Sequence, residues 1–155
     1  MGEQNVTIVC VKDGVMAADG SVFDGSVIVE TSMAKIVRSN DGAVAAACGV
    51  SGLTRRFRRL FLWSNPGTRA EEWPAADKES GFEAIWIELD GGVWRMGWDG
   101  QPHAAPAISA AGGARELALG AMYAGASAEE AVKICINRHA HAAGEVQVMR
   151  WGEKS

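Results

Sequence analysis

The sequence is short of cysteine and tyrosine, with three and one among 155 residues, and it contains no long apolar run. The cysteines are odd in number and each lies in an apolar stretch, so we expect buried, reduced thiols rather than a disulfide framework. No apolar run approaches the roughly 18–20 residues that a membrane-spanning helix needs. The opening residues, MGEQNVTIVC, lack the basic region and cleavage site of a signal peptide. These absences predict a cytoplasmic protein without a membrane span.

Length and composition predict one globular domain over residues 1–155. Hydrophobic residues make up 48% of the chain and charged residues 22%, which is typical of a protein that buries a core and not of a disordered tail. Fifteen basic residues against 19 acidic ones give a net charge of -4. This balance disfavours non-specific binding to a polyanion such as nucleic acid.

Short apolar segments between turn residues dominate the first fifty positions and predict β-strands. The Asp13-Gly14 dipeptide is a strong signal for a tight hairpin between the first two of them. The third and fourth are interpreted as another pair of short strands. The predicted strands cover residues 6–11, 15–18, 26–30, 35–38 and 43–48.

The pattern changes to helical spacing at residues 53–63. Leu53, Phe57, Leu60 and Phe61 share one face of this predicted helix, and four arginines spread over the rest. Residues 64–81 contain two prolines and several charges, which indicates a long loop or a poorly formed helical turn.

The second half alternates again between strands and helices. The predicted elements are a hairpin of residues 83–90 and 93–98 across two glycines, a short strand at 107–109, a helix at 114–124, a second helix and a last strand at 145–151. The second helix begins at Ser127 with Glu130 three positions later, which is a capping box, and Gly144 is its expected stop. Strands and helices in segregated runs favour an α+β protein with layered sheets over a parallel βαβ sheet.

Several segments resemble the proteasome β-type subunits, including the short phage and bacterial members, whose first hairpin is tight. The similarity extends over residues 7–151 and rests on the order of its segments. Those segments are residues 7–11 (TIVCV), 14–19 (GVMAAD), 35–36 (KI), 48–52 (CGVSG), 119–122 (LGAM) and 124–132 (AGASAEEAV).

The resemblance implies an N-terminal-nucleophile (Ntn) hydrolase fold, a four-layer αββα sandwich. In that family an N-terminal threonine attacks a peptide or amide carbonyl, and its own α-amino group is the general base. Matched position by position, the nucleophile is Thr7, the two charged residues that support it are Asp19 and Lys35, and the backbone N–H of the oxyanion hole belongs to Gly49. The resemblance also implies a homo-oligomer, and it implies neither a metal nor a cofactor.

Elementary chemistry is consistent with these assignments but allows simpler interpretations. A threonine hydroxyl is a weak nucleophile that needs an adjacent base, yet Thr7 is also an ordinary strand former. A partly buried Lys35 shifts the protonation of a neighbouring group, yet a lysine also protects a strand edge. Gly49 suits either an oxyanion donor or a tight turn from strand to helix.

The hairpin register decides how near Asp19 lies to Thr7. A two-residue turn pairs Lys12 with Val15, so that Thr7 faces Gly20 and Asp19 lies one step away. A one-residue bulge would instead place the carboxylate directly across from the threonine. In either register we expect a carboxylate close to Thr7.

Three departures from the family pattern favour a second hypothesis, a non-catalytic homologue that acts as a structural or assembly subunit. Six residues precede Thr7, so loss of Met1 would not free its amine, and cleavage would have to follow Val6 rather than a glycine. The position of the family's supporting serine holds Ala110, whereas Ser109 is one residue early and should point to the other face. The aspartate that the proteasome line carries before its last strand is missing from residues 139–144.

Three other constellations point to weaker alternatives. Cys135 and His139 are four residues apart, with His103 and His141 available, but the four converging ligands of a structural zinc site are not recognisable, and we expect no metal. The basic run at residues 55–59 could bind nucleic acid or another anion, but a solvated helix flank or an ion-paired subunit contact is the simpler interpretation. The tryptophan-rich hairpin at residues 86–98 could be a packing interface.

Overall fold

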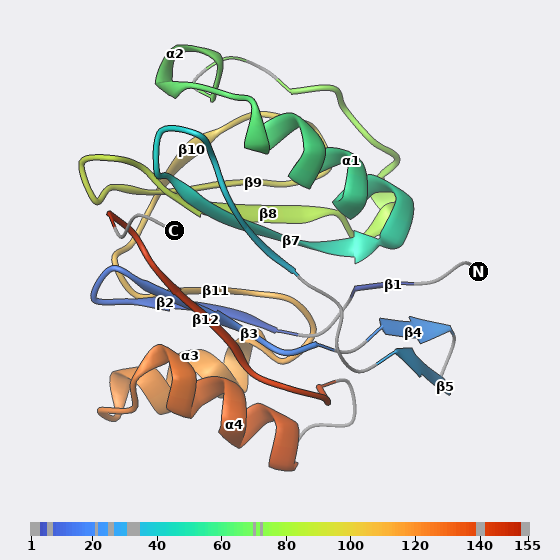
Figure 1. Cartoon of the computed structure of the whole chain (residues 1–155). Helices are drawn as coiled ribbons and strands as arrows, with labels where there is room; N and C mark the ends of the chain where they lie inside the picture. Colours follow the sequence, from blue (N-terminus) through green and yellow to red (C-terminus); the bar gives the residue numbers. More distant parts are fainter. Residues whose placement is uncertain are drawn as a thin grey trace.

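The computed structural model describes residues 4–5, 8–20, 22–24, 27–30, 35–69, 71, 73–138 and 142–152. Two β-sheets lie face to face, and helices cover the outer face of each, which gives four layers in the order αββα (Figure 1). Helix α1 (Ser51–Leu62), with the short α2 (Pro66–Arg69) beside it, forms one outer layer. Helices α3 (Arg115–Tyr123) and α4 (Ala128–Arg138) form the other. The predicted fold class is confirmed.

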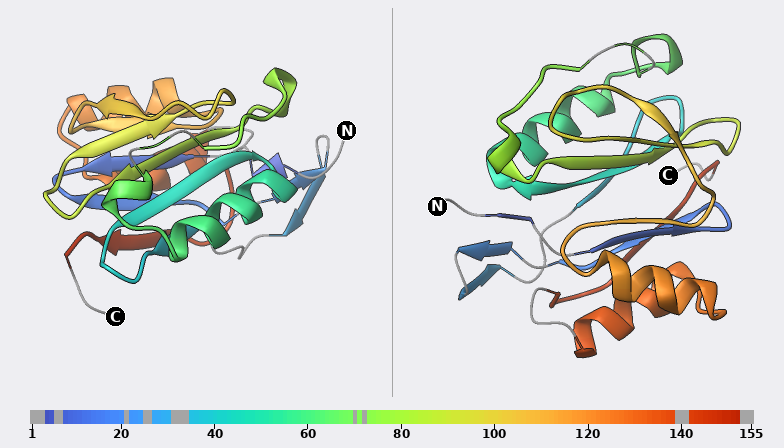
Figure 2. Two further views of the ribbon diagram at one scale, coloured as in Figure 1. Left: turned by 90° about the horizontal axis from the view of Figure 1, so that it is seen from above. Right: turned by 180° about the vertical axis from the view of Figure 1, so that it is seen from behind.

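The larger sheet has eight strands, in the order β10-β9-β8-β7-β1-β4-β5, with β6 also paired with β7. Figure 2 shows from above and from behind that β4 and β5 extend beyond the stack of sheets, on the side of the N-terminus. The strands are β1 (Gln4–Asn5), β4 (Val22–Asp24), β5 (Val27–Glu30), β6 (Ile36–Arg38), β7 (Val44–Val50), β8 (Glu83–Ile87), β9 (Val93–Met96) and β10 (His103–Ala105).

The smaller sheet is antiparallel, in the order β11-β2-β3-β12. Its strands are β2 (Val9–Lys12), β3 (Val15–Ala18), β11 (Ser109–Ala111) and β12 (Gln147–Arg150). The last strand of the chain therefore pairs with the second strand of the first hairpin. A short 3-10 helix, η1 (Lys78–Ser80), lies in the segment between α2 and β8.

The β2–β3 hairpin has the predicted two-residue turn, with Lys12 opposite Val15. Gly14 has a φ of +74°, and a Cβ there would lie 2.4 Å from Nε1 of Trp151, so the position excludes a side chain on two grounds. The Trp151 indole also lies against Gly91, in the turn between β8 and β9. The indole therefore joins hairpin tips that belong to different sheets.

Strand alternation divides the buried side chains among three cores. Ile8, Cys10 and Ala17 face α3 and α4. Val9 and Val11 face the space between the sheets, where they meet residues of β7 and β8. A third cluster packs between the larger sheet and α1 around Phe57, Phe61 and Trp86. Each strand of the central hairpin thus contributes to both of its faces, as period-two alternation requires.

The predicted pairing of residues 26–30 with 35–38 is wrong. β5 pairs with β4, a strand that the sequence analysis missed, and β6 pairs with β7. The turn at Asn40, Asp41 and Gly42 explains the second pairing, because it joins β6 directly to β7 and leaves β5 to a hairpin with its predecessor.

Several predicted boundaries move by a few residues. α1 starts at Ser51, two positions before the predicted start, because the first turn carries no apolar stripe that would reveal it. The short strand predicted at 107–109 corresponds to β11, and β10 lies in a stretch for which no strand was predicted. The Ser127 capping box is present, with reciprocal bonds of 3.0 and 3.1 Å to and from Glu130. Within the described ranges, no helix has both the length and the apolar character to cross a membrane.

Lys12 ties the central hairpin to the outer helices. Its ammonium donates to the carbonyls of Met122 and Ala126 at 3.0 and 2.8 Å, at the C-terminal end of α3. Met122 is in the last turn of α3 and Ala126 follows the helix, so the cation also complements the helix dipole.

We expect Lys12→Met to lower the free energy of unfolding by about 2 kcal/mol, because it removes two charge-assisted hydrogen bonds. Lys133→Met is the matched control, since the ammonium of Lys133 makes only an exposed 3.8 Å pair with Glu129 and its loss should cost about 0.3–0.5 kcal/mol. Urea denaturation followed by circular dichroism measures both. Equal losses in the two variants would contradict the role given to Lys12.

Candidate active site

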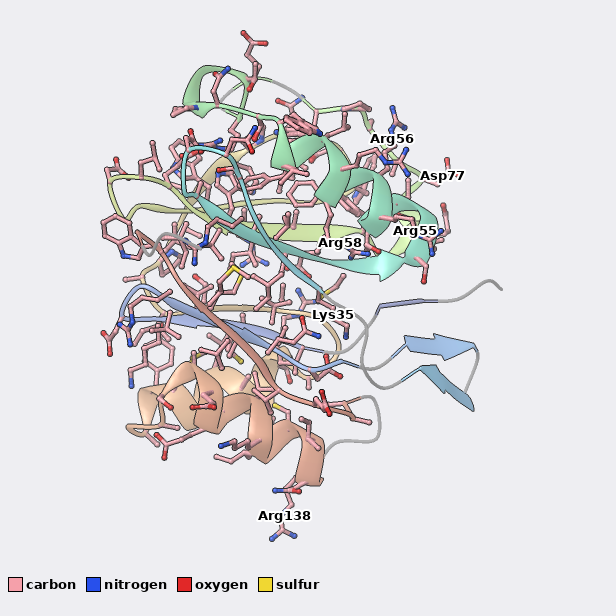
Figure 3. The ribbon with its side chains drawn as sticks, in the orientation of Figure 1. Lys35, Arg55, Arg56, Arg58, Asp77 and Arg138 are labelled. Carbon is pink, nitrogen blue, oxygen red and sulfur yellow. The ribbon has the colours of Figure 1, made fainter. Side chains whose placement is uncertain are left out.

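The centre of the candidate site is a buried ion pair between Asp19 and Lys35. Lys35 Nζ lies 2.6 Å from Asp19 Oδ1, and both side chains have an exposed fraction of 0%. Asp19 directly follows β3 and Lys35 directly precedes β6. Figure 3 shows Lys35 between the two sheets, at the end of the molecule where β7 meets α1. The sandwich thus brings together two charges that are sixteen residues apart.

Two backbone amides also donate to the Asp19 carboxylate. The N–H of Ile8 donates to Oδ1 at 3.3 Å, and the N–H of Ala143 donates to Oδ2 at 3.1 Å. Together with Lys35, these donors engage both carboxylate oxygens, which offsets part of the cost of burying the group.

The hairpin register places Asp19 opposite Ile8. The N–H of Asp19 donates to the carbonyl of Ile8 at 3.4 Å, which continues the regular pairing of β2 with β3 beyond Val9 and Ala18. The described part of this hairpin contains no bulge. Thr7, the predicted nucleophile, lies outside the described residues, and its chain neighbour Ile8 is hydrogen-bonded to the carboxylate.

Lys35 is also fixed through its backbone. Its N–H donates to Oε1 of Gln147 at 2.8 Å, at the start of β12. The last strand thus reaches the site through the Gln147 amide, while the chain just before it supplies the Ala143 N–H. Neither residue was a sequence candidate.

Gly49, the predicted oxyanion donor, lies in β7 two residues before α1. Its φ is +117°, and a Cβ would lie 2.8 Å from the Cα of Phe82. The backbone conformation and the close approach of residues 81–82 both require glycine here. The simple structural interpretation of Gly49 is therefore sufficient to account for the residue type, and it leaves the oxyanion role open.

The three cysteines, Cys10, Cys48 and Cys135, are buried free thiols. Burial raises the pKa of Cys48 to about 12, against a smaller lowering by the charge of Lys35, and burial raises the pKa of Cys135 to about 11. The pKa of Cys10 is also raised, first by burial and then by the neighbouring thiols and Asp19. Cys48 directly precedes Gly49 in β7. These thiols are protonated and are not nucleophiles at neutral pH.

Strand register places Ala110 and Ser109 on opposite faces of the smaller sheet. Ala110 lies opposite Cys10 and belongs to the core under α3 and α4, whereas Ser109 lies opposite Val11, on the alternate face. The Ser109 hydroxyl donates to the carbonyl of Pro106 at 2.5 Å. Its hydrogen bond is therefore made within the β10–β11 connection and not with Asp19 or Lys35.

The remaining candidates are the histidines and the cysteine considered as metal ligands and the basic run. His103 is exposed on β10, and Cys135 is buried on α4, while His139 and His141 lie outside the described residues. In the ranges that the structure does describe, no group of three or more His, Cys, Asp or Glu side chains could hold a metal ion. The basic run lies on α1, with Arg55, Arg56 and Arg59 exposed and Arg58 half-buried (Figure 3).

Comparison with solved structures shows the fold independently. One similar structure is BPH from Thiobacillus denitrificans in complex with epoxomicin, with a TM-score of 0.71 and 19% identity, covering 95% of this chain and 100% of that one. A second structure of BPH from Thiobacillus denitrificans has a TM-score of 0.70 and 18% identity, covering 96% of this chain and 100% of that one. Eukaryotic HslV from Trypanosoma brucei is also similar (0.62, 19%, 93% and 99%). No protein-family model matches the sequence, and no curated protein matches it. The chain thus has the fold of HslV and BPH over nearly its whole length.

We expect Lys35→Met to lower the free energy of unfolding by about 3–5 kcal/mol, because it leaves a buried carboxylate without its counter-charge. Adding Asp19→Asn to that variant should recover part of the loss, since the amide keeps an acceptor for Ile8 without the charge. Chemical denaturation of the two single variants and the double variant measures the coupling. A loss below about 1 kcal/mol in Lys35→Met would show that the pair does not hold the fold.

We expect Gly49→Ala to destabilise the protein by about 2 kcal/mol or more, through its positive φ and the contact with Phe82. Gly120→Ala is the control, because Gly120 is within α3, a Cβ there would meet no neighbouring atom within 4 Å, and alanine favours a helix by about 0.5–1 kcal/mol. Thermal unfolding of both variants should give shifts of opposite sign. Shifts of the same sign would contradict the backbone argument.

Proposed function

We infer that the protein is a proteasome-like threonine amidohydrolase or peptidase of the short phage and bacterial type, with Thr7 as its nucleophile. The observation that supports this most is the buried pair of Asp19 and Lys35. Its carboxylate binds the amide of Ile8, the residue that directly follows Thr7. A carboxylate and an ammonium held beside the start of a strand are the charges that such a nucleophile needs.

The proposed reaction begins when the Thr7 hydroxyl oxygen attacks the carbonyl carbon of a peptide or amide. The hydroxyl proton passes to the α-amine of Thr7, and the tetrahedral intermediate carries its negative charge on the former carbonyl oxygen. The C–N bond then breaks as the proton moves to the leaving amine, and water hydrolyses the ester that remains. The mechanism requires Thr7 to be the first residue of the working chain.

Lys35 and Gly49 have distinct roles in this proposal. The ammonium of Lys35 disfavours a second positive charge nearby, which keeps the α-amine ready to accept a proton. Asp19 holds that ammonium in place. The Gly49 N–H stabilises the oxyanion, and a donor of this kind is worth about 3–4 kcal/mol to the transition state.

The second hypothesis is a non-catalytic homologue with a structural or assembly role. Two observations favour it: Ala110 offers no hydroxyl, and the Ser109 hydroxyl is bonded to Pro106. In addition, both oxygens of Asp19 are engaged by groups that also hold the fold together, so stability alone is a reason to keep the pair. Under either hypothesis we propose a single domain over residues 1–155, a cytoplasmic location, self-association, no nucleic-acid partner and no cofactor.

A peptide epoxyketone distinguishes the two hypotheses, because it is an electrophile directed at an N-terminal threonine. We expect a chain that starts at Thr7 to gain the mass of one inhibitor molecule in intact-protein mass spectrometry, and to lose this labelling on Thr7→Ala. Thr68→Ala is the control, since Thr68 is exposed on α2. Epoxomicin, which is bound to BPH in the similar structure, is the compound to use.

The mass of the expressed full-length protein shows whether residues 1–6 are removed. Loss of residues 1–6 from the expressed protein, together with labelling, supports the peptidase. A full-length mass without labelling, combined with no labelling of the chain that starts at Thr7, overturns the peptidase and leaves the structural homologue.

A further inference from the structure

A pocket opens on the outer layer at the far end of the β8–β9 hairpin from Gly49. We call it the hairpin pocket; its lining includes Arg69, Trp86, Glu88, Leu89, Asp90 and Trp94. Trp86 and Trp94 are directly opposed on neighbouring strands, so their indoles lie on one face of the sheet. Leu89, at the rim, has an exposed fraction of 41%. Trp86 is buried and donates its indole N–H to Glu88, so the half-buried Trp94 forms the accessible aromatic wall of the pocket and Leu89 forms an apolar rim.

The charges around this pocket sum to a negative value. Arg69 is fully buried, bonds both oxygens of Glu88 at 2.7 Å, and bonds Asp41 at 3.0 Å. Among the lining residues, the carboxylates of Glu88 and Asp90 oppose the single positive charge of Arg69, which leaves a net charge of -1. The hydrogen bonds from Arg69 and Ser39 outweigh the effect of burial and lower the pKa of Asp41, so that group is ionised at neutral pH.

The Asp90 carboxylate can accept further hydrogen bonds. Its Oδ1 accepts the N–H of Gly92 at 2.8 Å, and no ion pair is present for it in the described part of the chain. A Cβ placed on Gly92 would lie 3.0 Å from that oxygen and 3.8 Å from Nε1 of Trp94. The carboxylate and the indole edge therefore flank the same small opening.

Helix α1, in the same layer, carries the complementary charge. Arg55, Arg56 and Arg59 are exposed on α1, and the described residues provide none of them with an ion pair. We call these three the arginine face. Figure 3 shows Arg55 and Arg56 at the end of α1 that follows β7, whereas the β8–β9 turn lies at the far end of that layer in Figure 1. The two surfaces do not meet within one chain.

We propose that the hairpin pocket is a guanidinium-binding site and that it takes an arginine from the arginine face of a second copy of this chain. A guanidinium fits because it stacks flat on an indole and forms paired hydrogen bonds with a carboxylate. Leu60 in α1, Trp63 directly after α1 and Leu89 beside the pocket are exposed and supply apolar contact. Since the two surfaces differ, the contact is head-to-tail. The inference deepens the proposed self-association and is independent of the peptidase chemistry.

Reversal of charge tests the contact in the full-length protein. We expect Asp90→Arg to weaken self-association by at least about tenfold in sedimentation velocity over a concentration series, and we expect higher salt to weaken it in the unaltered chain. Glu116→Arg is the control, because it makes the same change of charge at an exposed position on α3, in the opposite layer. The triple variant Arg55→Glu, Arg56→Glu, Arg59→Glu should also fail to associate alone, and it should associate with Asp90→Arg when the two are mixed.

The site itself is tested with a small probe. N-acetylargininamide should shift the indole N–H resonance of Trp94, identified by its absence in Trp94→Leu, and the uncharged citrulline analogue should not. Equal responses to the two compounds would overturn the guanidinium site. A chain that binds the arginine probe but stays monomeric at every concentration, or that associates equally well after both charge reversals, would overturn the second copy as its occupant. Epoxyketone labelling stays informative in each case, because it does not involve these residues.

Discussion

The buried pair of Asp19 and Lys35 is the interaction on which the architecture of the sandwich depends. A charge with no exposed surface is tolerated only when its partners are fixed, and here they come from separate parts of the chain. The first hairpin contributes Ile8, the entry to β6 contributes Lys35, and the final segment contributes Ala143 and Gln147. The pair therefore requires both sheets to be stacked before it is satisfied.

This constraint bears on the two functional hypotheses in the same way. A peptidase needs a carboxylate and an ammonium beside its nucleophile, and a structural subunit needs them to hold its first hairpin against β6 and β12. Gly49 is equally ambiguous, since Phe82 excludes a side chain whatever the amide does. Chemistry and stability make identical demands on these residues, so only the reactivity of Thr7 separates the two hypotheses.

Local signals predicted the parts of the fold that depend on local contacts. Asp13-Gly14 fixed a two-residue hairpin, and the Ser127 capping box marked the start of α4. Asp19 and Lys35 came from the family resemblance, and the structure brings them together. The pairing of β6 with β7 was missed because two short strands can pair with either neighbour. Ala143 was missed because a backbone donor has no residue type that reveals it, and Thr7 lies outside the described residues.

The order of the strands has a consequence for synthesis on the ribosome. β12 completes the smaller sheet, and Gln147 and Ala143 complete the surroundings of Lys35 and Asp19, yet all of them follow the other strands and helices in the chain. A nascent chain can form the β2–β3 hairpin early, but its central charges stay without two of their partners until residues 143–147 have left the exit tunnel. Ordering of the candidate site is therefore a late event in biosynthesis, and truncated products that stop before these residues cannot assemble it.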